Sequence, residues 1–158
     1  MPALSNARAL RVIGQDLETR GLKTFDIRRQ RDRFEVHCGY QAPPAPTPVL
    51  LEYSAADIDE LESRAQSNRR DATAPLDLLS LSQMLRSLGG YFDGKNINLV
   101  RISNVESAGA EARFKIEGET ERGERLTDER SASAIYDMGV NMYKQRGRAT
   151  ERYARWRR

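Results

Sequence analysis

The stretch closest to a known chemical motif is residues 89–96, GGYFDGKN, which fits the phosphate-loop pattern G-x-x-x-x-G-K. A phosphate loop continues with Ser or Thr, whose hydroxyl binds magnesium, but here that position is Asn96. The loop also leads from a strand into a helix, whose N-terminus faces the anion, whereas the order expected here is helix and then strand. We therefore expect no nucleotide site and interpret Gly89 and Gly90 as a helix end and a tight turn.

Nucleophile and metal chemistry have few residues to use, because the chain holds one histidine, His37, and one cysteine, Cys38. Both lie in an alternating stretch typical of a strand, where adjacent side chains point to opposite faces. They therefore form neither a nucleophile–base pair nor a shared metal site. We expect no catalytic residue, no metal and no cofactor, with Cys38 in the core and His37 on the surface. A single cysteine also excludes an internal disulfide and suits a reducing compartment.

Acidic residues form two groups. The first opens a predicted helix after Ser54, where negative charge is favourable at the positive end of the helix dipole. The second shares one face of a strand if residues 117–121 are extended, a spacing that could attract a divalent cation. Charge runs are usually solvated, so we favour helix stability for the first group and a solvated hairpin for the second. The groups are Asp57, Asp59, Glu60 and Glu62, and Glu117, Glu119 and Glu121.

Two basic stretches are the candidate nucleic-acid contacts. One is the predicted tip of the first hairpin, and the other is the C-terminal tail, where arginines would contact phosphates and an aromatic ring would stack on bases. The same tail would suit an anionic membrane surface, and the alternative is that its aromatic residues pack on the body while its arginines are solvated. The candidate residues are Arg28, Arg29, Arg31 and Arg33 in the hairpin, and Arg148, Arg152, Arg155, Trp156, Arg157 and Arg158 in the tail.

The charge of the chain is unevenly distributed. Its 158 residues carry a net charge of +3 at a mean hydropathy of −0.70. Residues 148–158 hold five arginines and one glutamate, so the rest of the chain has a net charge of −1. No stretch has the apolar length of a signal peptide or a membrane span. We expect a cytoplasmic protein without membrane insertion.

The elements that position these residues follow the order α-β-β-β-α twice. In the first unit, residues 1–73, Ser5 begins a helix that ends at Gly21, strands cover 22–29, 34–40 and 49–53, and Ser54 begins a second helix. A Pro-rich loop, 42–48, joins two of the strands, because proline cannot donate to a sheet ladder.

The second unit, residues 74–147, begins with a capping box at Ser80, and its strands cover 97–103, 112–117 and 125–129 before a helix that starts at Ser131. Residues 85–89, LRSLG, repeat the pattern of residues 10–14, LRVIG. The offset between the units is 75 residues at the first helices and 77 at the second helices. We expect an α+β fold made by tandem duplication, with antiparallel sheet or sheets, helices on one face and a pseudo-two-fold axis. Residues 148–158 form the basic tail.

The order α-β-β-β-α resembles that of the double-stranded-RNA-binding domain, whose second helix opens with lysines that contact phosphates. The matching positions here, 55–57 and 132–134, hold no lysine, so the resemblance is limited to element order and we match the sequence to no family. The expected function is a non-enzymatic binding module that contacts RNA or DNA through its basic stretches. The alternative is a protein-interaction or assembly module that binds a partner protein or a second copy through its sheet.

Overall fold

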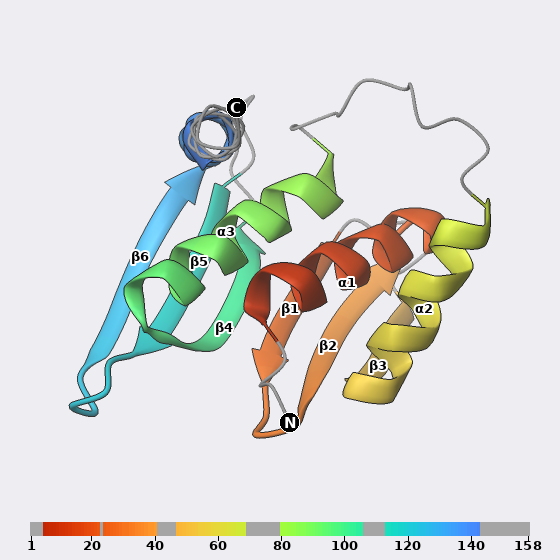
Figure 1. The fold of residues 1–158 in the computed structure, drawn as a ribbon, viewed down its shortest axis with the longest axis horizontal. Coiled ribbons are helices and arrows are strands. Elements are labelled where there is room, and N and C mark those ends of the chain that lie inside the picture. Colours follow the sequence, from red (N-terminus) through yellow and green to blue (C-terminus); the bar gives the residue numbers. More distant parts are fainter. Residues whose placement is uncertain (1–4, 23, 41–46, 69–79, 106–112, 143–158) are drawn as a thin grey trace, which may run out of the picture.

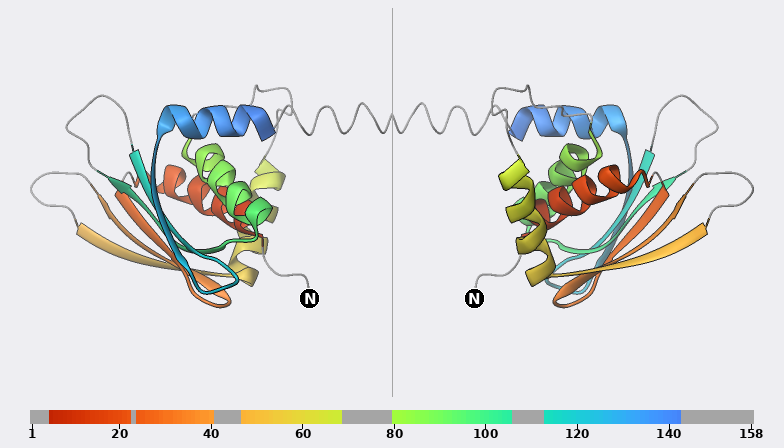
Figure 2. Two further views of the ribbon diagram at one scale, coloured as in Figure 1. Left: turned by 90° about the vertical axis from the view of Figure 1, so that its left-hand side faces the viewer. Right: turned by 90° about the vertical axis from the view of Figure 1, so that its right-hand side faces the viewer.

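In a computed structural model, the chain forms one six-stranded antiparallel sheet in the order β3-β2-β1-β4-β5-β6, with helices on one face (Figure 1). The structure describes residues 5–22, 24–40, 47–68, 80–105 and 113–142. Figure 2 shows that the sheet curves around the helices. The elements are α1 (Asn6–Arg20), β1 (Thr24–Arg29), β2 (Arg33–Tyr40), β3 (Thr47–Ser54), α2 (Ala55–Asn68), α3 (Leu81–Lys95), β4 (Asn98–Val105), β5 (Arg113–Glu119), β6 (Arg125–Ser131) and a last helix over 132–142.

The α+β prediction is confirmed, and the sequence had left open whether the strands form one sheet or two. They form one, because β1 pairs with β4 in the middle, where Ile27 lies opposite Ile102. Both isoleucines are fully buried. The two three-stranded meanders therefore share one hydrophobic core beneath α1 and α3.

Helices α1 and α3 lie side by side over the centre of the sheet and run in opposite directions (Figure 1). Glycine permits their close contact, because a Cβ on Gly14 would lie 2.8 Å from the Cα of Ser82, and one on Gly89 would lie 2.6 Å from the backbone of Asn6. The prediction that Gly89 and Gly90 end the helix is wrong, since α3 continues to Lys95. These glycines face neighbouring elements instead, and the side chain of Met142 lies 3.2 Å from a Cβ built on Gly90.

Each of these helices also caps the start of the other. The Asp93 carboxylate accepts hydrogen bonds from the backbone N–H groups of Asn6 and Ala7, at 3.1 and 3.0 Å. The Glu18 carboxylate accepts one from the N–H of Ser82 at 2.7 Å. Helix N-termini carry unpaired N–H donors and partial positive charge, so both contacts stabilise the helix pair. The predicted N-caps are confirmed, as Ser5 and Ser80 accept from the N–H of Arg8 and Gln83.

The Pro-rich segment was predicted as a loop over 42–48, and this boundary is wrong. Residues 41–46 lie outside the described residues, but Pro48 belongs to β3, where it is paired with Gly39. Strand β3 is at the end of the sheet, and an edge strand tolerates a residue that lacks an N–H donor. The first strand was predicted to begin at residue 22, whereas β1 begins at Thr24. Leu22 precedes this strand and is buried in the core.

The two outer helices pack on α1 and α3. Ser54 caps α2 as predicted, because its hydroxyl accepts from the N–H of Asp57, and Ile58 is fully buried. Ser131 begins the last helix in the same way, and Ile135 is fully buried. Within the described residues, no helix has the length and apolar character needed to cross a membrane.

Candidate functional site

The four hairpin arginines, Arg28, Arg29, Arg31 and Arg33, lie at or beside the β1–β2 turn as predicted, but they do not form one basic patch. Arg28 forms an ion pair with Asp26 at 3.2 Å, and Arg33 forms one with Glu52 at 3.8 Å. Arg31 is exposed at the turn and has no partner among the described residues. Two of these four arginines are therefore paired with neighbouring carboxylates.

Arg29 has a structural contact that the sequence did not reveal. Its guanidinium donates a hydrogen bond to the side-chain oxygen of Asn6, and it lies over the ring of Phe34 at 5.2 Å. The side chain is half-buried, and this burial lowers the pKa of Arg29, an effect that the nearby Asp93 carboxylate opposes. Arg29 thus joins the hairpin to the start of α1 by a hydrogen bond and a cation–π contact.

The helix-free face of the sheet carries charges of both signs. At its centre, Asp26 accepts two hydrogen bonds from Arg101, at 2.8 and 2.7 Å. Burial alone would raise the pKa of Asp26, but the hydrogen bonds from Arg101 and Arg28 lower it below its ordinary value. Further pairs follow on the outer strands, such as Lys115 with Glu117 at 4.0 Å. This face is largely self-neutralised, so it is not a basic surface.

The tail candidates Arg148, Arg152, Arg155, Trp156, Arg157 and Arg158 lie outside the described residues. Their role in nucleic-acid binding remains a prediction, as do the boundaries 1–73, 74–147 and 148–158.

The two edges of the sheet differ in how they are covered. On β3, the positions that face the helices are Val49, Leu51 and Tyr53, which pack against the core. On β6, the residues that face the helices are Leu126, Asp128 and Arg130, because they lie opposite the residues of β5 that face the core. Residues 125–129 are all exposed, including Leu126 at 42%. Strand β6 is therefore an edge strand exposed on both faces over residues 125–129, at the left of Figure 1, whereas Arg130 is half-buried over the ring of Tyr91 at 4.8 Å.

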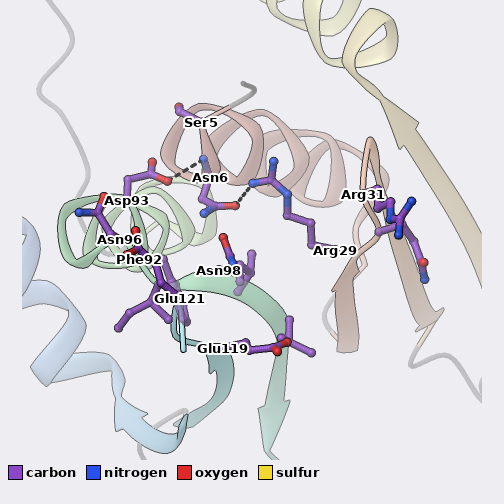
Figure 3. A pocket seen from close by; sticks show the side chains of 14 residues that line it. Ser5, Asn6, Arg29, Arg31, Phe92, Asp93, Asn96, Asn98, Glu119 and Glu121 are labelled. Atoms are coloured by element: carbon purple, nitrogen blue, oxygen red, sulfur yellow. Dashed lines mark hydrogen bonds between the residues drawn. The ribbon is translucent and has the colours of Figure 1, made fainter. Parts of the chain in front are cut away.

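A pocket of about 670 Å³ opens where β1 and β4 separate, and we call it the β1–β4 pocket (Figure 3). The pairing of β1 with β4 ends at Arg28 and Arg101, and β4 is irregular between Leu99 and Arg101. Beyond this point the turn after β1 and the start of β4 lie on either side of the opening. Its lining is Ser5 and Asn6 at the start of α1, residues 29–31 of the hairpin, Phe92 and Asp93 of α3, residues 96–100, and Glu119 and Glu121 near the β5–β6 turn.

The charges around the β1–β4 pocket are of both signs. Arg29 and Arg31 lie on the hairpin side, and Glu119 and Glu121 on the β5–β6 side (Figure 3). Neither glutamate has an ion-pair or hydrogen-bond partner among the described residues. Asp93 is already used by the N–H groups of α1, so the start of that helix is not open to an anion. The sequence identified the two arginines as candidate nucleic-acid contacts and the two glutamates as members of an acidic group. No sequence pattern indicated that these residues surround one pocket.

The structure separates the single histidine and cysteine as predicted. Cys38 is buried, its thiol lies 3.4 Å from the carbonyl oxygen of Val49, and burial raises its pKa. His37 is exposed beside Glu35 at 3.4 Å. In the part of the chain that the structure describes, His, Cys, Asp and Glu side chains form no group of three or more that could hold a metal ion.

Comparison of the chain with known protein families, with curated proteins and with solved structures finds no match.

Proposed function

We propose that this chain is a non-enzymatic interaction module, built from two copies of an α-β-β-β-α unit, that assembles with a second copy through the edge of β6. The observation that carries the proposal is the exposure of β6, since every residue from 125 to 129 is exposed on a strand that ends the sheet. An edge strand presents unpaired backbone N–H and C=O groups to another chain.

Two equivalent contacts between the units, made by residues that correspond at an offset of 75 positions, support the duplication. Gly14 meets Ser82, and its counterpart Gly89 meets Ala7, which is the counterpart of Ser82. Each glycine thus has the same neighbour in the other unit, as a pseudo-two-fold axis requires. The same offset relates the caps Ser5 and Ser80, the capping carboxylates Glu18 and Asp93, and the left-handed helix ends Gly21 and Asn96.

The charges of β6 favour a second copy as its partner. If two β6 strands pair antiparallel with Thr127 opposite Thr127, each Arg125 lies opposite Glu129 of the other copy. Residues opposite each other lie on the same face of a sheet, and opposite charges stabilise such pairs by about 0.2–1 kcal/mol. Shifting the centre to Asp128 would place two aspartates opposite each other, which is unfavourable. A single edge buries little area, so we expect a weak, concentration-dependent dimer.

The test is a charge exchange followed by sedimentation equilibrium over a range of protein concentrations. Arg125→Glu and Glu129→Arg should each weaken the dimer, because each variant opposes like charges across the axis. The double variant should restore association, because it recreates the opposite-charge pairs in reverse. Glu129 also forms an ion pair with Arg113 at 3.3 Å, so Arg113→Gln is the control for loss of that contact and should leave dimerisation unchanged.

A chain that is monomeric at all concentrations would refute assembly through β6. A dimer whose dissociation constant is unchanged by both single charge substitutions would also refute it.

A second candidate, nucleic-acid association, rests on the exposed Arg31 at the hairpin turn together with the five arginines after Gly147. Fluorescence anisotropy with RNA and DNA duplexes tests it, using the full chain and a truncation after Gly147. Electrostatic binding should fall steeply with salt and disappear on truncation. Absence of binding by the full chain at low salt would exclude this candidate.

A further inference from the structure

We infer that the β1–β4 pocket binds a short peptide with free termini, its carboxylate on the Arg31 side and its ammonium group on the side of Glu119 and Glu121. This site uses other residues than assembly through β6, although Glu119 lies opposite Arg125 in the sheet, and either proposal can fail while the other stands.

The charges around the pocket indicate which class of ligand it binds. Arg31, Glu119 and Glu121 have no partner among the described residues, and charges of opposite sign lie on different sides of the same opening (Figure 3). A nucleotide or another simple anion would face the two glutamates, and a polyamine would face Arg29 and Arg31. A ligand with one charge of each sign, at opposite ends, matches both sides.

The backbone around the pocket favours a peptide over another dipolar molecule. Pairing between β1 and β4 is recorded only from Asp26 to Arg28 and from Arg101 to Ser103. Val100 is the next residue of β4; it borders the pocket and is paired with neither β1 nor β5 in the register of the sheet. A peptide can place its own N–H and C=O groups along this part of β4, which is the chemistry of strand addition.

The volume and the apolar lining of the pocket suit a short peptide whose central side chain is apolar. Its volume of about 670 Å³ falls in the range of about 300–1,000 Å³ that is usual for small-molecule sites. Phe92, Ile97 and Leu99 contribute apolar surface to the lining, and Phe92 and Leu99 are buried core residues that fix its shape. An apolar side chain between two charged termini would contact this surface.

The test uses the tripeptide Ala-Leu-Ala in four forms: with free termini, N-acetylated, C-amidated and blocked at both ends. Each is titrated into the isotope-labelled full chain, and backbone amide shifts are followed by NMR. The free peptide should shift amides of residues 29–31, 96–100 and 119–121. Each single block should weaken binding roughly threefold to tenfold, as expected for loss of one partly exposed charge contact. The doubly blocked peptide should cause no shift at these residues.

Variants then assign each terminus to its side of the pocket. Arg31→Gln should weaken the free peptide as much as amidation does, and should have no further effect on the amidated peptide. Glu121→Gln combined with Glu119→Gln should show the same relationship with acetylation. Arg122→Gln and Glu124→Gln are matched controls, since they lie on the β5–β6 turn but do not line the pocket, and they should bind like the unaltered chain.

Three results would overturn the inference. One is the absence of shifts around the pocket with the free peptide. Another is equal binding of the free and doubly blocked peptides. The third is a response of the same amides to inorganic phosphate without any response to the peptide, which would make the pocket an anion site.

Discussion

Gly89 of α3 lies directly against the backbone of Asn6 in α1, where an added Cβ would be 2.6 Å from the Asn6 carbonyl. Real Cβ atoms do not approach backbone atoms so closely, so any side chain at this position must push the two helices apart. The contact between these helices thus depends on glycine within α3, at a position where glycine is otherwise unfavourable for a helix.

We predict that Gly89→Ala destabilises the protein by about 1–3 kcal/mol, as overpacking of a tight core contact does. Gly94→Ala is the control, because it lies in the same helix and its Cβ would meet nothing within 4 Å. That substitution should stabilise by about 0.5–1 kcal/mol through higher helix propensity. Urea unfolding followed by circular dichroism measures both. Equal effects of the two substitutions would show that the helix contact is not tight.

The Asp93 carboxylate provides a second prediction, because it accepts two backbone N–H groups at the start of α1. Asp93→Ala removes both acceptors and should cost about 1–2 kcal/mol in the free energy of unfolding. Asp93→Asn keeps one acceptor oxygen and should cost less. Glu124→Ala, an exposed acid whose side chain has no partner among the described residues, should change stability by less than about 0.5 kcal/mol. The prediction fails if Asp93→Ala is as mild as Glu124→Ala.

Glu62 provides a prediction about acid stability. Hydrogen bonds from Arg8 hold the pKa of Glu62 below its ordinary value, despite the opposing effect of burial. The folded state therefore binds this proton less readily than the unfolded state. The resulting stability is present above about pH 4.3, the ordinary value of glutamate, and is lost as the pH falls toward the lower pKa of the folded state.

Glu62→Gln should therefore flatten the fall in unfolding free energy between about pH 5 and pH 3, and should cost roughly 0.5–1 kcal/mol near neutral pH. Glu60→Gln is the control on the same helix, since its ion pair with Arg64 is largely exposed and should contribute little. Urea unfolding at a series of pH values gives the comparison. Parallel pH profiles for the unaltered chain and Glu62→Gln would contradict the assignment.

Local sequence patterns predicted most of the secondary structure. Ser5 and Ser80 marked helix starts because their side chains accept the first N–H groups of the helix, a contact made within a few residues. Alternation marked β2 for an equally local reason, since one face is buried and the other is solvated. Even the polar β6 lies over Arg125–Ser131, although Leu126 was the only apolar residue in its predicted span.

The predictions that failed concern residues whose neighbours are distant in the sequence. Gly89 and Gly90 have the composition of a helix end, but their place inside α3 depends on α1 and on Met142, which lie against them. Pro48 looked incompatible with a ladder, and only the order of the strands made β3 an edge that accepts it.

Ion pairing likewise decided the character of the hairpin. Arg28 and Arg33 were predicted as candidate nucleic-acid contacts. In the sheet, Arg33 forms an ion pair with Glu52 on the next strand, and Arg28 forms one with Asp26. The β1–β4 pocket had no counterpart in any local pattern, because its walls come from four separate parts of the chain. The sequence by itself determined the elements, their order and the buried faces, since these depend on interactions along the chain. Tertiary structure alone decided which charges remain unpaired and where the sheet opens, since both depend on which distant residues meet.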